Sequence, residues 1–558
     1  MTLRVIAGWE PALIFENPLQ LWAPRTLDGA LSALTDADQA LDAGYFIAGA
    51  LSYELGAMLH GVNTHASRLP LLLLGAFHAP GKRNLARDGR RFAMTAPLCR
   101  VDRREYETNV HRLLSRIRDG EVYQVNYTVP FDAGFSGDPF DLYRFLARRA
   151  RARYAAFLEH EDVSLVSLSP ELFLRFDGTR LSTKPMKGTA PLSRIEDLAN
   201  EKNRAEHVMI VDLLRNDLHR VCTDVCVPRL FEIERYPTFA TMTSTVTGKL
   251  ATNSFAQVVR AVFPCGSVTG APKLAAMRHI AQVETQPRGF YTGSMGFLSP
   301  GRRGWWNVPI RTLQFERGAA AARFDAGGGI VSDSGAPDEW AEIFLKTRVL
   351  SPAHDGFTIW ETLRGGPDPS DAGAHVERLA ASAAKFGWTI ERDLLLSRLR
   401  AFDGAGAPQL VRVRAGEKQT RIHAGPLTQT SEPVRVCFAS RPVRSDDPLL
   451  AHKTAWRLLH DAAAREAREL GCFDALLRNE RGEMTEGART TLFVRSGGTL
   501  YTPPLSSGVL PGILRSRLVS QARAVERVLF PGDLVRADAL YVGNSARGLL
   551  QAELVQDA

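Results

Sequence analysis

Lysine is scarce in this chain, and the positions where it remains are the first candidates for amine chemistry. Of the 69 lysine and arginine residues, only 10 are lysine. Arginine keeps its proton in proteins, so it cannot act as an amine nucleophile or form a Schiff base, whereas lysine can do both. Two lysines have distinctive surroundings. Lys187 lies in the Pro/Gly-containing segment 184–191, and Lys453 lies just ahead of a predicted helix at residues 457–470.

The surroundings of Lys187 predict a rigid turn after a strand, because Gly188 and two prolines restrict the local backbone. Glu171 precedes it in the segment Ser169-Pro170-Glu171, on what we expect to be a neighbouring strand. A carboxylate and an amine placed in this way can act as an acid/base and a nucleophile. The residues alone leave open an ordinary solvated loop lysine.

Carboxylates on two predicted helices are candidate ligands for Mg²⁺, which prefers hard oxygen ligands. Glu206 lies on the helix predicted over residues 196–220, and Glu339 and Glu342 lie one turn apart on a helix predicted from 338 to 350. The simpler alternative is that Glu342 pairs with Lys346 at i,i+4. The spacing by itself favours that alternative.

Two glycine-rich runs predict binding of a small anion through backbone N–H groups. The residues concerned are Gly266, Ser267 and Thr269 in the run before a predicted helix, and Gly327, Gly328 and Gly329 in the run after a predicted strand. Neither run is a P-loop or a dinucleotide-binding fingerprint. Together with Arg311, they indicate a small anionic substrate rather than a nucleotide.

A second constellation surrounds Lys453. Glu486 follows a strand and a turn, residues 508–515 open a helix with Pro511 near its start, and Ser545 follows a strand. An amine, a carboxylate and an anion cradle are the set that pyridoxal 5'-phosphate needs. Each of these residues taken alone reads as an ordinary turn residue.

The elements that must position these residues predict two domains of mixed α+β and α/β class. A chain of 558 residues is too long for one hydrophobic core. Short strands at 163–167, 172–176 and 180–183 precede the helix predicted over residues 196–220, and one strand is expected over 306–316. The polar segment 351–356 is the candidate linker. We therefore expect domains at residues 1–351 and 352–558.

Composition excludes several classes. Apolar residues make up 45% and charged residues 23% of the chain, which is typical of globular proteins. The longest apolar stretch, residues 69–77, is far shorter than the roughly 18 residues of a membrane span. With no signal-peptide pattern at its start, we expect a cytoplasmic protein without membrane contact. The net charge of +8 is spread along the chain, so we expect no nucleic-acid partner.

Several segments of the first domain resemble the chorismate-binding enzymes, which include component I of anthranilate synthase and of aminodeoxychorismate synthase, and isochorismate synthases. The matching segments are 169–171, 185–189, 203–217, 266–273, 310–313 and 327–331, within roughly residues 100–350. The resemblance implies a β-sandwich-with-helices fold like that of anthranilate synthase component I. It also implies chorismate as the substrate, with ammonia from solution or from a separate glutamine amidotransferase subunit. No glutaminase Gly-x-Cys-x-Gly motif is present in the chain.

The same resemblance assigns roles. Lys187, where anthranilate synthases carry Ala, would attack chorismate C2 with help from Glu171, and ammonia would then add at C4. Thr241 stands where anthranilate synthases use a His that assists pyruvate loss, so this domain is expected to stop at aminodeoxychorismate. Mg²⁺ would be held by Glu206 and Glu342, with Glu339 nearby. Substrate contacts would come from Arg311, the two glycine runs, Tyr291 and Gly293.

The second domain resembles fold-type IV pyridoxal-phosphate enzymes over about residues 356–555, through segments 357–364 and 375–382 and the residues around Lys453. That family contains D-amino-acid and branched-chain transaminases and aminodeoxychorismate lyase. The resemblance implies Lys453 as the Schiff-base lysine, Glu486 at the pyridine nitrogen, and Arg378, Ile513 and Ser545 around the phosphate. It also implies a homodimer formed through this domain. Thr491 and Leu514 depart from the usual Asn and Thr.

Neither resemblance alone selects a reaction for the second domain, but their fusion does. The first domain would make 4-amino-4-deoxychorismate, and a lyase would eliminate pyruvate from it to give 4-aminobenzoate, a folate precursor. A transaminase in the second domain is the alternative, and a basic scaffold or nucleic-acid-binding protein is the non-enzymatic one.

Overall fold

The structure is a computed structural model that describes residues 2–8, 11–83, 85, 92–190, 192–199, 201–236, 240–319, 321–350, 358–366, 371–402, 406–416, 419–455 and 457–555. The chain forms two compact units. The first comprises residues 1–90, 97–133 and 138–353, and the second comprises residues 91–96, 134–137 and 354–558. The predicted linker at 351–356 and the predicted boundary at 352 lie outside the described residues.

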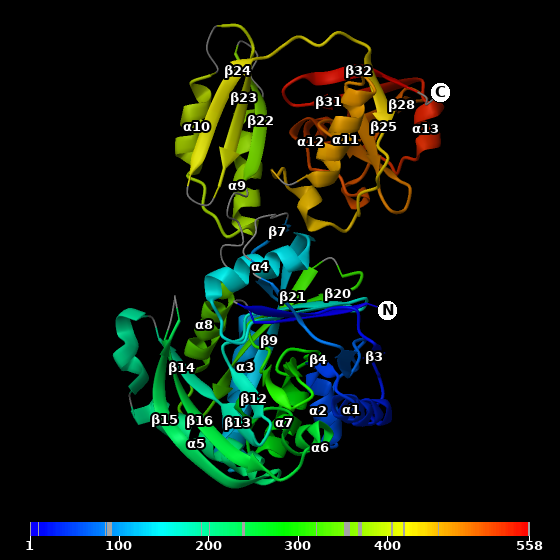
Figure 1. Ribbon diagram of the computed structural model, residues 1–558. Helices are drawn as coiled ribbons and strands as arrows, with labels where there is room; N and C mark the ends of the chain where they lie inside the picture. Colours follow the sequence, from blue (N-terminus) through cyan, green and yellow to red (C-terminus); the bar gives the residue numbers. More distant parts are fainter. Residues whose placement is uncertain are drawn as a thin grey trace. The chain divides into compact units, whose positions relative to one another are not determined.

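Two large sheets with helices packed around them make up the first unit (Figure 1). The 11-stranded sheet follows the order β17 (Gly270–Ala271), β9 (Gln124–Gly137), β21 (Ala321–Ile330), β20 (Thr312–Glu316), β11 (Val163–Ser167), β10 (Ala156–His160), β1 (Leu3–Ala7), β2 (Ala12–Phe15) and β6 (Gly81–Arg83), with β7 (Phe92–Met94) and β8 (Leu98–Cys99) also paired to β9. The 10-stranded sheet follows the order β14 (Met186–Ala190), β16 (Ala240–Leu250), β13 (Arg180–Lys184), β12 (Leu172–Asp177), β19 (Arg303–Asn307), β18 (Ser294–Leu298), β4 (Phe46–Leu51), β5 (Leu72–Phe77) and β3 (Gln20–Trp22), with β15 (Cys222–Arg235) beside β16.

The helices of this unit are α1 (Leu27–Asp42), α2 (Tyr53–Leu59), α3 (Arg103–Arg118), α4 (Pro139–Ala150), α5 (Glu201–His219), α6 (Phe255–Val262), α7 (Lys273–Val283) and α8 (Ala336–Thr347). Short 3-10 segments η1 (Leu192–Ala199), η2 (Gly266–Val268) and η3 (Arg348–Leu350) complete the unit.

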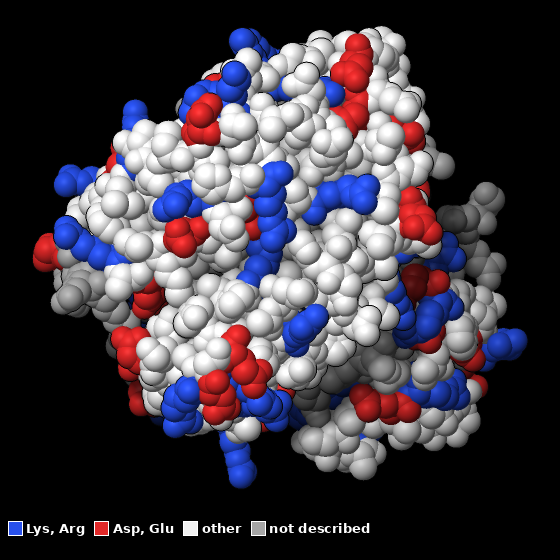
Figure 2. Space-filling model, turned by 90° about the horizontal axis from the view of Figure 1, so that it is seen from below, with Lys and Arg blue, Asp and Glu red and all other residues white. Residues whose placement is uncertain are grey.

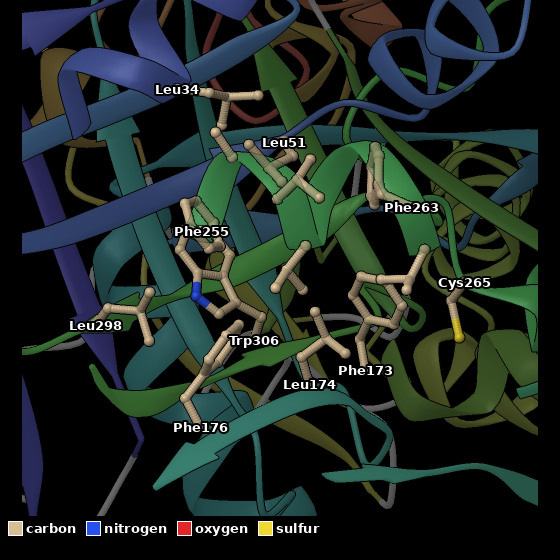
Figure 3. Close-up of a cluster of buried hydrophobic side chains, with 14 of the residues drawn as sticks. Leu34, Leu51, Phe173, Leu174, Phe176, Phe255, Phe263, Cys265, Leu298 and Trp306 are labelled. Carbon is tan, nitrogen blue, oxygen red and sulfur yellow. The ribbon is translucent and has the colours of Figure 1, made fainter. Parts of the chain in front are cut away.

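A core cluster anchors the segments that carry the candidate site (Figure 3). Trp306 stacks on Phe255 with ring centroids 5.0 Å apart, and Phe173 lies 6.0 Å from Phe263. Phe173 follows Glu171 by two residues, and Phe263 leads directly into the loop at Cys265–Thr269. Because buried aromatic side chains resist displacement, this packing fixes the backbone on both sides of the site.

The second unit contains a three-stranded and an eight-stranded sheet. The smaller sheet has the order β22 (Ile359–Gly365), β23 (Gln409–Ala415) and β24 (Thr420–Pro426), and helices α9 (Ala372–Lys385) and α10 (Arg392–Arg400) share its apolar core. The larger has the order β27 (Met484–Gly487), β26 (Asp474–Arg478), β25 (Val434–Phe438), β32 (Gly548–Leu554), β31 (Ala539–Asn544), β28 (Thr491–Ser496), β29 (Thr499–Thr502) and β30 (Val525–Glu526). Its helices are α11 (Leu458–Glu469), α12 (Ile513–Ser520) and α13 (Pro531–Val535), with η4 (Pro448–Ala451) and η5 (Leu505–Ser507).

The mixed class predicted from sequence is confirmed, as are the strands β11, β12 and β13. Two predicted elements were wrong in detail. Residues 306–316 form two strands rather than one, because the chain turns between β19 and β20, where Arg311 has a left-handed φ of 52°. Gly327–Gly329 lie inside β21 instead of following it. They do not form a turn; because they lack a Cβ atom, they let neighbouring groups approach the strand closely.

Surface charge is mixed on the face shown in Figure 2, where basic side chains alternate with acidic ones. In the described part of the chain, no helix is long and apolar enough to cross a membrane.

Candidate active sites of the two units

Lys187 lies on β14, where it pairs with Met242 of β16. Its Nζ atom is 3.2 Å from Oε2 of Glu206 on α5. A Cβ atom added at Gly329 of β21 would lie 2.9 Å from this Nζ, so a side chain at this position would displace the amine. Both side chains of the ion pair are less than one-fifth exposed. The structure thus holds the amine between two sheets and a helix, which is not the solvated loop that the residues left open.

Gln124, at the start of β9, is a residue that motif reading missed. It is fully buried, and neither atom of its side-chain amide has a hydrogen-bond partner. A Cβ atom at Gly329 would lie 2.8 Å from its side-chain nitrogen, so Gln124 and Lys187 meet at the same glycine. A buried amide without partners costs free energy, which is typical of a group that serves a ligand. A polar residue at the start of a buried strand was the only available sequence signal.

Glu171 is the buried carboxyl group of this site, with only 3% of its surface exposed. Burial raises its pKa to about 7, although hydrogen bonds from Ser267 and the Met186 N–H, and the charge of Lys187, act in the opposite direction. Its Oε1 atom has no hydrogen-bond partner. A carboxyl group whose pKa is raised in this way can keep its proton near neutral pH and deliver it.

The glycine strand β21 approaches its neighbours unusually closely. A Cβ atom at Gly327 would lie 2.1 Å from the Tyr127 carbonyl oxygen, and one at Gly328 would lie 2.9 Å from Oε2 of Glu339. Lys346, which sequence reading treated only as an ion-pair partner, donates to the Gly327 carbonyl oxygen at 2.6 Å. Lys346 therefore brings a second amine to this strand.

The predicted metal ligands are engaged elsewhere in this structure. Glu206 pairs with Lys187, Glu342 pairs with Lys346 at 2.7 Å, and Glu339 accepts a hydrogen bond from Ser334 at 2.7 Å. Burial raises the pKa of Glu339, and the neighbouring Glu342 adds to the effect. Within the described residues, no group of three or more His, Cys, Asp or Glu side chains lies close enough to hold a metal ion. We assign no step to the ion, and the three carboxylates stay predicted Mg²⁺ ligands.

The other predicted substrate residues have varied surroundings in the first unit. Arg311 is partly buried, and burial lowers its pKa to about 10 against an opposing influence from Tyr236. Gly266 packs against Leu213, and Thr269 is fully buried with its hydroxyl bonded to the Cys265 and Gly266 carbonyl groups. Tyr291 lies in a buried network of charges that includes Arg288 and Asp325, and Gly293 lies against the Leu51 carbonyl. Thr241 donates to the Gly188 carbonyl at 2.6 Å.

In the second unit, Lys453 lies on a segment that pairs with β22. The Trp360 N–H donates to the Lys453 carbonyl oxygen at 2.7 Å. Burial lowers the pKa of the Lys453 amine to about 8, against the charge of Glu361 and in the same direction as Arg378 and Arg457. A lysine that gives up its proton near neutral pH is suited to Schiff-base chemistry.

Glu486, on β27, is held as an anion. Its Oε1 accepts hydrogen bonds from Arg457 and, at 3.0 Å, from His460. Its Oε2 accepts one from the Leu510 N–H at 3.3 Å. Burial alone would raise the pKa of Glu486, but these donors outweigh it, and the pKa is lowered. An ionised carboxylate here can accept a hydrogen bond from a protonated ring nitrogen. Arg457 and His460 were missed because their role depends on the fold.

Arg378 links the remaining predicted residues. Its guanidinium group donates to both oxygens of Glu361, at 2.8 and 2.6 Å, and to the Pro511 carbonyl oxygen at 2.8 Å. Pro511 lies just before α12, whose first residue is Ile513. Ser545 donates to the Thr362 carbonyl oxygen at 3.3 Å, which attaches it to β22.

These groups fit pyridoxal phosphate by their chemistry. An amine of lowered pKa, an ionised carboxylate, a guanidinium group and the free N–H groups of a helix start belong to one unit. The Nε atom of Arg457 is buried without a partner, which is consistent with a site that accepts a further polar group.

Comparisons with known proteins agree with this division. Residues 82–352 match the family described as chorismate binding enzyme, and residues 358–555 match the family described as amino-transferase class IV. Together these matches account for most of the chain.

Among curated relatives, aminodeoxychorismate synthase component 1 of Salmonella typhimurium is 39% identical over 265 residues, which covers 45% of this chain and 58% of the relative. Its Escherichia coli counterpart is 40% identical over the same shares. The chain thus spans just over half the length of these relatives. A solved structure of anthranilate synthase component I from Streptococcus pneumoniae aligns with a TM-score of 0.52 at 22% identity, covering 62% of this chain and 92% of that one. That likeness shows the fold alone.

Proposed function

The chain joins a domain of the chorismate binding enzyme family to a domain of the class IV aminotransferase family, and from this premise we propose that it makes 4-aminobenzoate in two steps. The first unit aminates chorismate to 4-amino-4-deoxychorismate. The second eliminates pyruvate from that product. The observation that carries the proposal is that the partly buried amine of Lys187 lies near enough to the buried Glu171 carboxyl group for its charge to lower the pKa of that group, because an amine nucleophile and a proton donor then belong to one site.

In the proposed amination, the Lys187 nitrogen gives up a proton and forms a bond to ring C2 of chorismate as the C4 hydroxyl group leaves. Glu171 donates the proton with which that hydroxyl departs as water. Ammonia then bonds to C4, and the Lys187 amine leaves C2. Gln124, with an unpartnered amide beside the amine, is placed to hydrogen-bond the substrate or the incoming ammonia. Arg311 is assigned to a substrate carboxylate.

Residues of the second unit are assigned to the elimination. Bound pyridoxal phosphate would supply an electron sink for the carbon that loses its proton. Lys453 would hold the cofactor and then take the C4 proton, Glu486 would pair with the ring nitrogen, and Arg378, Ile513 and Ser545 would surround the phosphate. Loss of the C4 proton and of pyruvate leaves the ring aromatic.

A transaminase remains the competing assignment for the second unit. The lyase is favoured because the first unit would deliver its substrate in the same chain. Ammonia would come from solution or from a separate glutamine amidotransferase subunit. We further propose cytoplasmic residence and a homodimer through the second unit, on the resemblance to fold-type IV enzymes.

The test is to incubate the purified chain with chorismate, Mg²⁺, ammonium and pyridoxal phosphate and to follow 4-aminobenzoate and pyruvate. Both products should form without an added amino acid. If aminodeoxychorismate accumulates and pyruvate appears only when an amino donor is supplied, the second unit is a transaminase.

Magnesium is tested separately, because the described carboxylates do not form a cluster. We expect Glu206→Gln and Glu342→Gln each to raise the Mg²⁺ concentration at half-maximal amination about tenfold or more, since each removes an anionic ligand. Circular dichroism checks that both variants fold. Unaltered Mg²⁺ titrations in both variants would show that Glu206 and Glu342 act only as ion-pair partners of Lys187 and Lys346.

A further inference from the structure

Arg288 is the most completely bonded side chain near the first site, although no role in the reaction has been assigned to it above. It is 2% exposed. Its Nε and one terminal nitrogen donate to the two oxygens of Glu284, at 2.9 and 2.6 Å. The remaining bonds go to the Val268 carbonyl at 2.9 Å, the Thr292 hydroxyl at 3.1 Å and the Asn126 carbonyl at 2.8 Å. All five N–H groups of the guanidinium are thereby used.

The three acceptors outside Glu284 belong to three different segments of the candidate site. Val268 follows Ser267, which bonds Glu171. Asn126 lies two residues after Gln124 on β9, and Thr292 follows Tyr291 directly. One guanidinium group therefore ties the loop that supports the proton donor to the strand that carries the unpartnered amide.

Main-chain pairing alone joins these segments only weakly. Strand β17 has two residues and pairs Gly270 with Val125 and Ala271 with Gln124. Two more main-chain bonds join the segments, from the Asn126 N–H to the Thr269 carbonyl at 2.9 Å and from the Tyr123 N–H to the Ala271 carbonyl at 2.7 Å. Such a short ladder gives little resistance to sliding, so the bonds from Arg288 to Val268 and Asn126 set its register.

Glu284 is itself held in place. Its Oε1 accepts the Thr128 N–H at 3.0 Å and the Thr128 hydroxyl at 2.9 Å, both from β9. The Arg288 guanidinium carbon also lies 4.6 Å from the Tyr53 ring centroid. The main-chain N–H of Arg288 donates to the Glu54 carboxylate at 2.8 Å. These contacts fix the guanidinium plane on all sides.

We propose that Arg288 is a positioning residue for the amination, which holds the Ser267 loop and the Gln124 strand at the spacing that the Lys187 and Glu171 chemistry requires. The inference rests on the proposed amination of chorismate. Lysine cannot replace arginine here, because an ammonium group has three donors and no planar fork.

The test compares Arg288→Lys with Arg302→Lys in the full chain. Arg302 is also buried, at 9% exposure, and bonds Asp38 and Asp42 away from the site. We expect Arg288→Lys to lower kcat for amination about 100-fold, as a displacement near 1 Å does, with KM for chorismate changed less than about threefold. Arg302→Lys should keep wild-type kcat per folded molecule. The amination rate should fall as pH rises through the pKa of Glu171, and the pH at which it falls should change in Arg288→Lys and not in Arg302→Lys.

A structural role alone would lower the folded fraction without changing kcat or the pH limb of the folded molecules, and that result would overturn the proposal. If Arg288→Lys does not fold, the Thr128→Val variant tests the positioning role instead. It removes one hydroxyl from Glu284 without burying a charge, and kcat should fall about fivefold. An unchanged kcat in Thr128→Val would reject the proposal. Wild-type protein that forms no aminodeoxychorismate would instead reject the proposed function.

Discussion

Polar groups buried without partners mark the chemistry at the scale of single residues. Glu171 and Gln124 each leave a buried polar atom unbonded, whereas the equally buried Arg288 satisfies every donor. Burying an unbonded polar group costs about 1–3 kcal/mol. Gln124 meets Lys187 at Gly329, and the charge of Lys187 lowers the pKa of Glu171.

Replacing Lys187 by Ala should lower amination at least about 10³-fold, because the variant lacks the nucleophile. The matched control is Lys184→Ala on β13, since Lys184 pairs with Glu234 and Glu232. Chorismate amination is measured by chromatography, with activity on supplied aminodeoxychorismate as the integrity check. Equal amination in both variants would contradict a covalent role for Lys187.

The pH dependence of amination follows from the raised pKa of Glu171, about 7. A proton donor is active below its pKa, so the rate should fall as pH rises through 7. The Ser267 hydrogen bond lowers this pKa, so Ser267→Ala should raise it and move the descending limb to higher pH by about one unit. A limb that moves to lower pH, or stays in place, would show that another group controls it.

At the scale of elements, side chains from distant segments fix the ends of helices and strands around the site. Asp38 of α1 accepts hydrogen bonds from Ser254 Oγ at 2.6 Å, the Phe255 N–H at 2.7 Å and the Ala256 N–H at 3.0 Å. It thereby satisfies the start of α6, whose Phe255 packs against Phe176 in the core. A carboxylate at this position also interacts favourably with the helix dipole.

We expect Asp38→Ala to destabilise the first unit by about 2 kcal/mol, because it leaves helix N–H groups unsatisfied. Asp42→Ala is the control, because Asp42 is largely exposed and pairs with Arg302. Its loss should cost less than about 1 kcal/mol of unfolding free energy. Urea unfolding followed by tryptophan fluorescence measures both. Equal losses of unfolding free energy in the two variants would mean that the pairing with Arg302, and not the cap on α6, stabilises this part of the first unit.

At the scale of the whole molecule, the two units provide a test of the order of the steps. Lys453→Ala should still consume chorismate and should accumulate aminodeoxychorismate, with pyruvate release lowered at least about 10³-fold. It should also lose the visible absorbance of bound pyridoxal phosphate. Lys385→Ala, an exposed lysine at the end of α9, is the control. Normal 4-aminobenzoate formation in Lys453→Ala would reject the assignment of this lysine.

Local motifs were enough to predict the chemistry class, because nucleophiles, glycines and turn prolines impose rules on neighbouring residues that are visible in sequence. The scarcity of lysine led to Lys187 and Lys453, and the glycine runs led to Ser267 and Gly329. The same local reading predicted most strands around Glu171, since alternation and turn residues are short-range signals.

What only the tertiary structure decided is which distant groups meet. Gln124 lies beside Lys187 because β9 and β14 belong to different sheets that approach at Gly329, and no spacing in the sequence records that approach. The five bonds of Arg288, and the hold of Arg457 and His460 on Glu486, likewise join segments far apart in the chain. The structure also separated the predicted metal carboxylates into ion pairs and a hydroxyl contact. Sequence reveals which residues are able to react, whereas burial and long-range hydrogen bonding determine which of them face one another and in which protonation state.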